Sequence, residues 1–486
     1  MWGNFTTFGE TFQNLTDSKL IEFFRSLPPR QQARLGDFLQ SPFFNKNEDV
    51  VLLFYYVQKY APSFTHENLS RQAILRQAGF QKPLNEKSLA QLSSRLLALA
   101  EKFLVVESFL ADDWAQKLAL TQRYHELDLP KHYKAARTEL EKSPETFPFR
   151  NVEFYRRQLL AEQTFLEHGD RNQHGYNERL QTAANALDIY FIAEKLRYAC
   201  DALNYQSVLN LRYEADFLEE ILEWSASPAF ASVPAVQVYR HLALMLKEPD
   251  EPAHYEKALL SLTGSERYFQ PPELRQMYTL LLNYCTRRVN RYNDEYFLNE
   301  HLEINKLLLR NELIFENGFL PPWRFTNIVT AGLKTGQADW TWQFLHDYRR
   351  RLPADYADNV FRYNLAQYHY YLKNYDDAQR ALVQVEISDV LLNVSVRSLL
   401  VKIYCETEQT ELLFSCLEAT RIFLHRNQLL DPQTKKQMQK FVEYTAKFAK
   451  TPPGDRERYL ALLNQLPPAR DMMHREWLAG QLKKRL

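Results

Sequence analysis

Glycine is scarce in this sequence, and its scarcity limits the folds that the chain can adopt. The chain holds 12 glycines in 486 residues, whereas an average composition of about 7% would supply roughly three times as many. Glycine provides the left-handed and tight-turn conformations that short strands need between them. The sequence therefore disfavours a turn-rich β fold and predicts an all-α protein.

Long apolar stretches are also missing. No window approaches the roughly 18 uninterrupted apolar residues of a membrane-spanning helix. Apolar residues nevertheless make up 45% of the chain, which is too many for a disordered protein and enough for an extensive core. The stretch before Asp17 contains no lysine or arginine, so it lacks the charged start of a secretory signal. We expect a cytoplasmic protein that does not enter a membrane.

Paired cysteines and a net charge are absent as well. The four cysteines form no CxxC pair, so neither a zinc ribbon nor a dithiol redox motif is indicated. The 60 basic residues are balanced by 60 acidic ones. Nonspecific nucleic-acid binding depends on counterion release by a basic excess, and the chain as a whole has none.

The usual motifs of catalysis are not found. The sequence contains no GxGxxG, GxxxxGK[ST], GxSxG or HExxH pattern, and these are the spacings that place nucleotides, nucleophiles or metal ligands. We therefore expect no catalytic residue, no cofactor and no metal site. An enzyme whose site is assembled from distant residues stays an alternative that nothing in the sequence favours.

Prolines divide the first part of the chain into short helices. Between Pro28 and Pro83, apolar residues recur at three- and four-residue spacing, which is typical of amphipathic helices. We predict a compact helical domain over residues 1–112. Its helices at 69–78 and 85–106 leave two uses open, docking of a protein or contact with DNA as a helix-turn-helix variant. The second helix carries few exposed basic residues, so docking is favoured.

Three units between residues 323 and 425 can be aligned with one another. Their anchor residues Thr341, Ala378 and Leu413 are 37 and 35 residues apart, close to a repeat of about 34 residues. The aligned positions are Ile328, Gly336, Thr341, Leu345 and Pro353 in the first unit, Leu365, Tyr375, Ala378 and Leu382 in the second, and Leu400, Tyr404, Leu413 and Leu417 in the third.

These units resemble tetratricopeptide repeats, over about a fifth of the chain. The resemblance implies antiparallel helix pairs stacked as a solenoid. We divide the rest of the chain accordingly, with degenerate helical hairpins over 113–322, tetratricopeptide-like pairs over 323–450, and capping helices over 451–486, the last from Met472. The chain also looks like large helical-repeat proteins of Bacteroidota bacteria, a likeness that carries no functional residues.

Two departures from the repeat pattern have structural consequences. Lys373 and Glu408 stand where Gly336 follows the first helix of its unit. The small residue at the crossing of the two helices is Ala378 in the second unit, but Thr341 and Leu413 take its place in the others. We expect looser or rotated packing at those two crossings.

The resemblance also places a partner-binding surface. In such repeats the first helix of each pair lines the inner surface of the stack, which implies that a peptide or helix of a partner protein binds there. The alternative is that several of these aromatic rings belong to the core. The candidate residues are Trp323, Asn327, Tyr363, Asn364, Gln367, Tyr370 and Lys402.

One known binding mode of the family is not expected here. Some members hold a terminal carboxylate with lysine, arginine and asparagine on successive inner helices. Asn364 matches one of these positions, but Thr326, Thr330, Ser395 and Leu399 occupy the others. The sequence therefore predicts that this carboxylate clamp is absent.

Two arginine clusters suggest a rival function. Arginines beside aromatic rings can hold phosphates and stack on bases, which would make the chain a nucleic-acid-associated regulator. The simpler interpretation is that nearby acids offset a solvated face, and we favour it. The clusters comprise Arg287, Arg288 and Arg291 beside Tyr292, and Arg349, Arg350 and Arg351 beside Tyr348.

Overall fold

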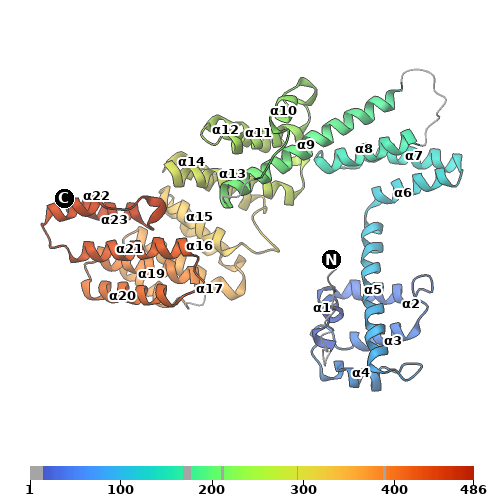
Figure 1. Ribbon diagram of the computed structural model, residues 1–486, viewed down its shortest axis with the longest axis horizontal. Coiled ribbons are helices and arrows are strands. Elements are labelled where there is room, and N and C mark those ends of the chain that lie inside the picture. Colours follow the sequence, from blue (N-terminus) through green and yellow to red (C-terminus); the bar gives the residue numbers. More distant parts are fainter. Residues whose placement is uncertain (1–14, 168–176, 210–212, 293, 387–389) are drawn as a thin grey trace, which may run out of the picture. The chain divides into compact units, whose positions relative to one another are not determined.

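A computed structural model describes residues 15–167, 177–209, 213–292, 294–386 and 390–486 (Figure 1). Within these ranges the chain forms 23 α-helices and six short 3-10 helices, with no β-strand. The prediction of an all-α protein is confirmed. The stretch before Leu15, which bears on the absence of a secretory signal, lies outside the described residues.

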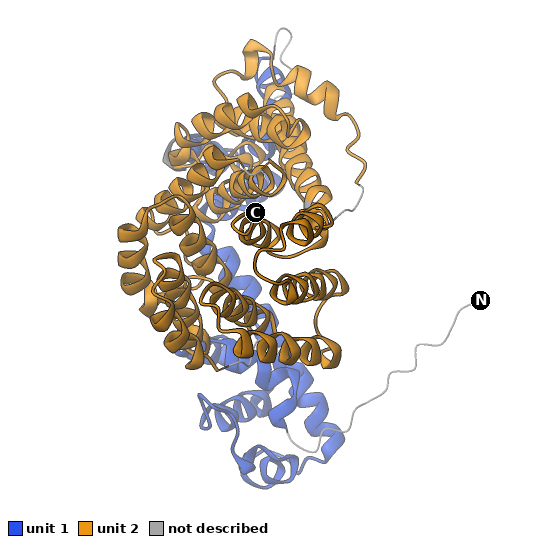
Figure 2. Cartoon of the chain, turned by 90° about the vertical axis from the view of Figure 1, so that its left-hand side faces the viewer, with its two compact units in different colours: residues 1–147, 157–184 blue, residues 148–156, 185–486 orange. Residues whose placement is uncertain are grey.

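The chain divides into two compact units, which Figure 2 distinguishes by colour. Unit 1 comprises residues 1–147 and 157–184, and unit 2 comprises residues 148–156 and 185–486. Of the three limits between them, one precedes α8 (Val152–Glu167), one falls within it, and one falls within α9 (Glu178–Leu209). No described helix is both long and apolar enough to cross a membrane.

Unit 1 begins with a bundle in which α1 to α5 bury one apolar cluster. Two buried amides close the ends of its helices: Gln32 donates to the carbonyls of Phe24 and Leu27, at 3.1 and 2.9 Å, and Asn45 donates to Leu39 O at 2.9 Å. The helices of unit 1 before α8 are α1 (Lys19–Ser26), α2 (Pro29–Gln40), α3 (Glu48–Gln58), α4 (Arg71–Gln77), α5 (Glu86–Ala111), α6 (Asp113–Glu126) and α7 (Pro130–Thr146).

Unit 2 continues from α9 as a series of helices that pack on their neighbours in sequence. α11 packs on α12, and α13 on α14, around an apolar cluster that extends from Val152 to Tyr368. The first helices of this series are α10 (Leu218–Trp224), α11 (Pro234–Lys247), α12 (Pro252–Thr263), α13 (Pro271–Tyr292) and α14 (Glu295–Arg310).

Three helix pairs follow in the region where the sequence shows its repeats. Within it, α15 contacts α16 and α17, and α17 contacts α18 and α19. The pairs are α15 (Pro322–Lys334) with α16 (Ala338–Tyr348), α17 (Ala354–Tyr371) with α18 (Tyr375–Val383), and α19 (Val390–Glu406) with α20 (Thr410–Arg426).

The turns inside these three pairs share one backbone geometry. Gly336, Lys373 and Glu408 all adopt left-handed conformations, with φ of 75°, 60° and 57°. Each is followed by an amide that donates at 2.9 Å to a carbonyl five residues earlier: Gln337 to Gly332, Asn374 to His369, and Gln409 to Tyr404. A left-handed residue after the last turn is a common way to end a helix, and it favours glycine. The second and third pairs keep the geometry without the glycine.

The crossing in the first pair is close, not loose. Thr341 is fully buried, and a Cβ placed on Gly332 of the facing helix would overlap its Oγ1. The absence of a side chain at Gly332 therefore makes room for the larger residue at the crossing. Leu413, in the third pair, is buried as well. Looser packing is wrong for the first crossing, because the expectation considered only one side of that crossing. Rotated packing stays a prediction.

The last helices are α21 (Pro432–Lys450), α22 (Arg456–Asn464) and α23 (Arg475–Lys483). The final helix begins at Arg475 and not at Met472, because His474 takes a left-handed conformation, with φ of 52°. The residues before this helix and its first turn form a terminal segment, defined here as residues 469–477. This segment folds back beside α19 and α21, where its residues line a cavity.

Candidate functional site

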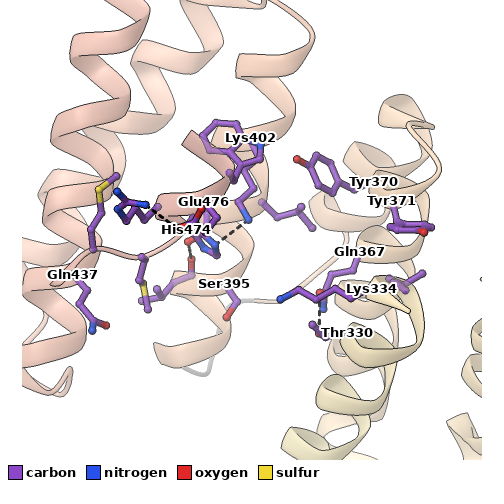
Figure 3. Close-up of a pocket in the computed structure, with 18 of the residues that line it drawn as sticks. Thr330, Lys334, Gln367, Tyr370, Tyr371, Ser395, Lys402, Gln437, His474 and Glu476 are labelled. Carbon is purple, nitrogen blue, oxygen red and sulfur yellow. Dashed lines mark hydrogen bonds and ion pairs between the residues drawn. The ribbon is translucent and has the colours of Figure 1, made fainter. Parts of the chain in front are cut away.

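A cavity of about 690 Å³ lies in unit 2 and is called the inner cavity here. Its walls are one face each of α15, α17 and α19, Gln437 of α21, and the terminal segment. In Figure 3, Lys334 and Gln367 extend from α15 and α17, while Lys402 and His474 lie across the cavity from them. The volume lies within the roughly 300–1,000 Å³ of typical ligand sites.

Helical spacing explains why each helix contributes several residues. On α17 the lining residues are 363, 367, 370 and 371, and on α19 they are 394, 395, 398, 399 and 402. Residues three and four apart lie on the same face of a helix. The inner face of α17 therefore presents aromatic rings and an amide to the cavity, and that of α19 presents two hydroxyls and an amine.

Four of the seven predicted partner-binding residues line this cavity: Tyr363, Gln367, Tyr370 and Lys402. Trp323 and Asn327 do not line it. They lie exposed on α15, and the Trp323 side chain is 57% accessible. The inner cavity thus collects the predicted residues of α17 and α19 but not those at the start of α15.

Asn364 is buried beneath the cavity wall and serves the packing of the helices. Its Nδ2 donates to Thr326 Oγ1 at 3.0 Å and to Val360 O at 2.8 Å. Its Oδ1 accepts from Gln367 Nε2 at 3.1 Å, and Gln367 Oε1 accepts from Thr330 Oγ1 at 3.4 Å. This network fixes the Gln367 amide at the cavity surface.

A carboxylate at the end of α19 ties the terminal segment to the repeats. Trp477 Nε1 donates to Glu406 Oε1 at 2.6 Å, Tyr375 donates to Oε2 at 2.7 Å, and Tyr370 also donates to Oε1. Burial raises the pKa of Glu406, but these hydrogen bonds outweigh burial and hold its pKa below the ordinary value. Glu406 is therefore ionised and fully engaged.

Lys402 has a different environment, although it lies one helical turn from Glu406. Its Nζ is 2.9 Å from His474 Nδ1 and 6.0 Å from the centre of the Trp477 ring. Burial, and then repulsion from Lys334, lowers the pKa of Lys402 to about 8, against a smaller opposing effect of Glu406. The amine is still mostly protonated at neutral pH.

His474 is neutral at the same pH. Burial among protein atoms, followed by the charges of Lys402 and Lys334, holds its pKa well below the ordinary value, while the residue keeps access to solvent. An ammonium group can only donate, so Nδ1 accepts from Lys402 and the ring proton resides on Nε2. The neutral ring positions the lysine without cancelling its charge.

The terminal segment is the part of the site that sequence reasoning missed. Met473 N donates to Gln437 O at 3.3 Å, and Gln437 Nε2 donates to Arg470 O at 2.7 Å. Arg475 is held by Pro467 O at 2.9 Å and by Glu476 at 2.7 Å. The break at Pro467-Pro468 indicated a change of direction, but nothing in the repeat pattern related this segment to α19.

The first arginine cluster is occupied by intramolecular contacts. Arg288 is 3.3 Å from Asp294 and stacks 4.5 Å from the Tyr292 ring centre, while Arg291 is 3.6 Å from Asp250. Burial lowers the pKa of Arg287, which packs on the Tyr284 ring.

The second arginine cluster is partly occupied in the same way. Arg349 is 2.6 Å from Asp358, and Arg351 is 3.9 Å from Glu312. Arg350 lies exposed beside them. Acids thus face both clusters, but the second cluster pairs with Asp358 and Glu312 and not with Asp355, the acid expected from the sequence.

Burial also determines the protonation of the cysteine thiols. Burial raises the pKa of the Cys285 and Cys405 thiols to about 12, so they stay protonated. No group of three or more histidine, cysteine, aspartate or glutamate side chains within those residues is placed to hold a metal ion. Comparisons of the chain with family models, with curated proteins and with solved structures found no match.

Proposed function

We propose that this chain is a non-catalytic interaction scaffold of the cytoplasm, in which tetratricopeptide-like helix pairs stack as a solenoid and the inner cavity receives a peptide or helix of a partner protein. The observation that carries the proposal is the convergence of α15, α17 and α19, the first helices of three successive pairs, on one cavity. The shared geometry of the turns after these helices supports their equivalence as repeats.

The lining of the inner cavity suits a peptide. Aromatic rings supply a large contact area at low entropic cost, and Tyr363, Tyr370 and Tyr371 supply them here. The Gln367 amide and the Ser395 hydroxyl are of the kind that bonds a peptide backbone. The hydrogen bonds that hold Gln367 and Tyr370 pre-organise these groups, which reduces the entropic cost of binding.

Two tyrosines of α17 make a matched test. Tyr371 lines the inner cavity and is 43% exposed, whereas Tyr356 lies on the same helix, is 50% exposed and does not line it. Peptides selected from a displayed random library against the full chain would be measured by fluorescence polarisation with each alanine variant. We expect Tyr371→Ala to weaken binding by about tenfold, as for a central aromatic contact, and Tyr356→Ala to change it less than about twofold.

Two results would overturn this function. If no library peptide binds the full chain, the inner cavity is not a peptide site. If peptides bind but Tyr371→Ala and Tyr356→Ala weaken them equally, the peptide binds elsewhere on the molecule.

A further inference from the structure

The inner cavity contains two ammonium groups with no acidic partner. Lys402 has His474 Nδ1 as its hydrogen-bond partner and no ion pair. Lys334 has neither a hydrogen bond nor an ion pair from its side chain within the described residues, and Figure 3 shows it extending toward the cavity. Both amines lie near enough to His474 for their charges to disfavour a positive charge on its ring.

The nearby carboxylates are already used. Glu406 accepts hydrogen bonds from Tyr370, Tyr375 and Trp477. Glu476, the only acid of the cavity lining, is paired with Arg475 at 2.7 Å. The excess positive charge of the cavity is therefore not neutralised by the lining itself.

An unpaired charge that is partly buried is costly, because burial removes solvation without supplying an opposite charge. This cost applies to Lys402, which is partly buried, whereas Lys334 lies exposed beside it in the cavity wall. At Lys402 a neutral nitrogen of His474 accepts a hydrogen bond from the amine. This bond orients the amine but does not neutralise its charge. An anionic group entering the cavity would supply the missing charge and form charge-assisted hydrogen bonds, which are roughly twice as strong as neutral ones.

We propose that Lys334 and Lys402, with His474 holding Lys402 in place, form an anion-binding subsite for an acidic side chain within the peptide bound in the inner cavity. This inference rests on the proposed function. The subsite is built differently from the carboxylate clamp of the repeat family, because it uses Lys334 at the last turn of α15 and a histidine from the terminal segment.

The surroundings of the two lysines define the preferred peptide further. Leu333, Met472 and Met473 line the same cavity, and methionine side chains adapt to apolar groups of various shapes. The preferred peptide therefore carries an acidic residue with an apolar residue close to it in sequence.

Inorganic phosphate serves as the first probe, titrated calorimetrically into the full-length protein. We expect Lys402→Met to weaken phosphate binding by roughly tenfold and Lys334→Met to weaken it as well, because each removes a charge-assisted contact. Lys447→Met is the matched control. Lys447 also belongs to unit 2, but its Nζ is 2.8 Å from Glu443 and the residue does not line the cavity. Lys402→Arg keeps the charge and should retain most of the affinity, which separates loss of charge from loss of fold.

A selected peptide serves as the second probe, in its acidic form and with each glutamate or aspartate replaced by its amide. One amide replacement should cost roughly tenfold with the wild-type protein and almost nothing with Lys402→Met, since the coupling vanishes when either partner is removed. If peptides bind in a Tyr371-dependent manner but no amide replacement costs affinity, the anion subsite is wrong and the peptide groove stands.

The converse result separates the two hypotheses. If phosphate binds in a Lys402-dependent manner but no peptide binds, the cavity takes a free small anion, and both the peptide source and the scaffold function are refuted. Equal phosphate binding by wild type and Lys402→Met, or no phosphate binding by either, refutes the subsite itself.

Discussion

The arginines of α13 and the lysines of the inner cavity carry the same charge in opposite surroundings. Arg288 faces Asp294 at 3.3 Å and lies over the Tyr292 and Phe297 rings. Lys402 faces a neutral histidine and a second lysine, with its nearest acid engaged by other donors. Arg288 and Lys402 are both partly buried, so exposure does not distinguish these two residues.

The difference teaches where to look for binding in a chain of zero net charge. The arginines of α13 lie closer together in sequence than the cavity lysines do. Their charges, however, are used in ion pairs and ring contacts with neighbouring residues of the same fold. The cavity lysines are 68 residues apart in sequence and become a pair only through the fold. An unpaired charge, not a local density of charge, indicates a ligand.

The largest expected effect is on stability, and it tests whether Glu406 accepts the hydrogen bonds of its three donors. Glu406→Ala would leave Tyr370, Tyr375 and Trp477 without their acceptor, and partly buried donors without partners are costly. We expect the free energy of unfolding of unit 2 to fall by about 2–4 kcal/mol, measured by urea denaturation. Glu408→Ala, which removes an exposed pair with Arg485, should cost less than about 0.5 kcal/mol. Equal losses of unfolding free energy in the two variants would show that the hydrogen bonds to Glu406 do not stabilise the fold.

The next effect tests whether the arginines are structural. Arg288 is 15% exposed and Asp294 25% exposed, so Arg288→Met loses a shielded ion pair and two ring contacts. We expect a loss of about 1–2 kcal/mol of unfolding free energy and no change in phosphate binding. Arg291→Met, at a side chain that is 62% exposed, is the control and should stay within about 0.5 kcal/mol. Phosphate affinity that falls in Arg288→Met would move the anion site to α13.

The smallest effect concerns pH and sharpens the contrast at Lys402. Its pKa of about 8 means that the amine loses its charge as pH rises from 7.5 to 9. His474 is already neutral in this window. Phosphate affinity of the wild type should therefore fall by up to roughly tenfold and approach that of Lys402→Met. Affinity that does not change over this range would mean that Lys402 is not the contact.

Stability should respond to pH in the opposite direction. The pKa of Lys402 is lowered in the folded state from 10.5, so between about 8 and 10.5 the unfolded chain binds the additional proton. Unfolding then becomes less favourable as pH rises through this window. The wild type should gain stability relative to Lys402→Met over the same range, as measured by urea denaturation at each pH.

The helices and half of the site followed from local pattern. Scarce glycine and the three-and-four spacing of apolar residues predicted an all-α chain, because both reflect helical geometry directly. Tyr363, Gln367, Tyr370 and Lys402 were placed by repeat position, and all four line one cavity. Asn364, predicted beside them, is buried instead, because adjacent residues of a helix point about 100° apart.

The other half depended on contacts that no pattern encodes. The terminal segment brings Met473, His474 and Trp477 to the site. Its hydrogen bond from Trp477 to Glu406 joins residues that are 71 positions apart in sequence. The left-handed conformation that turns this segment occurs at His474 and not at a glycine, so the residue type gave no signal. Gly332 was missed for a related reason, since its role depends on Thr341 across a helix crossing.

The return of the terminal segment to α19 has a consequence for the order in which the site appears. During synthesis the chain emerges from its amino end, so α15, α17 and α19 can fold before residues 469–477 exist. The inner cavity lacks one wall until then, so it is completed only after the three helices that form its other walls. A ligand that fills the cavity contacts both these helices and the terminal segment. By mass action it would protect the folded chain against proteolysis and heat.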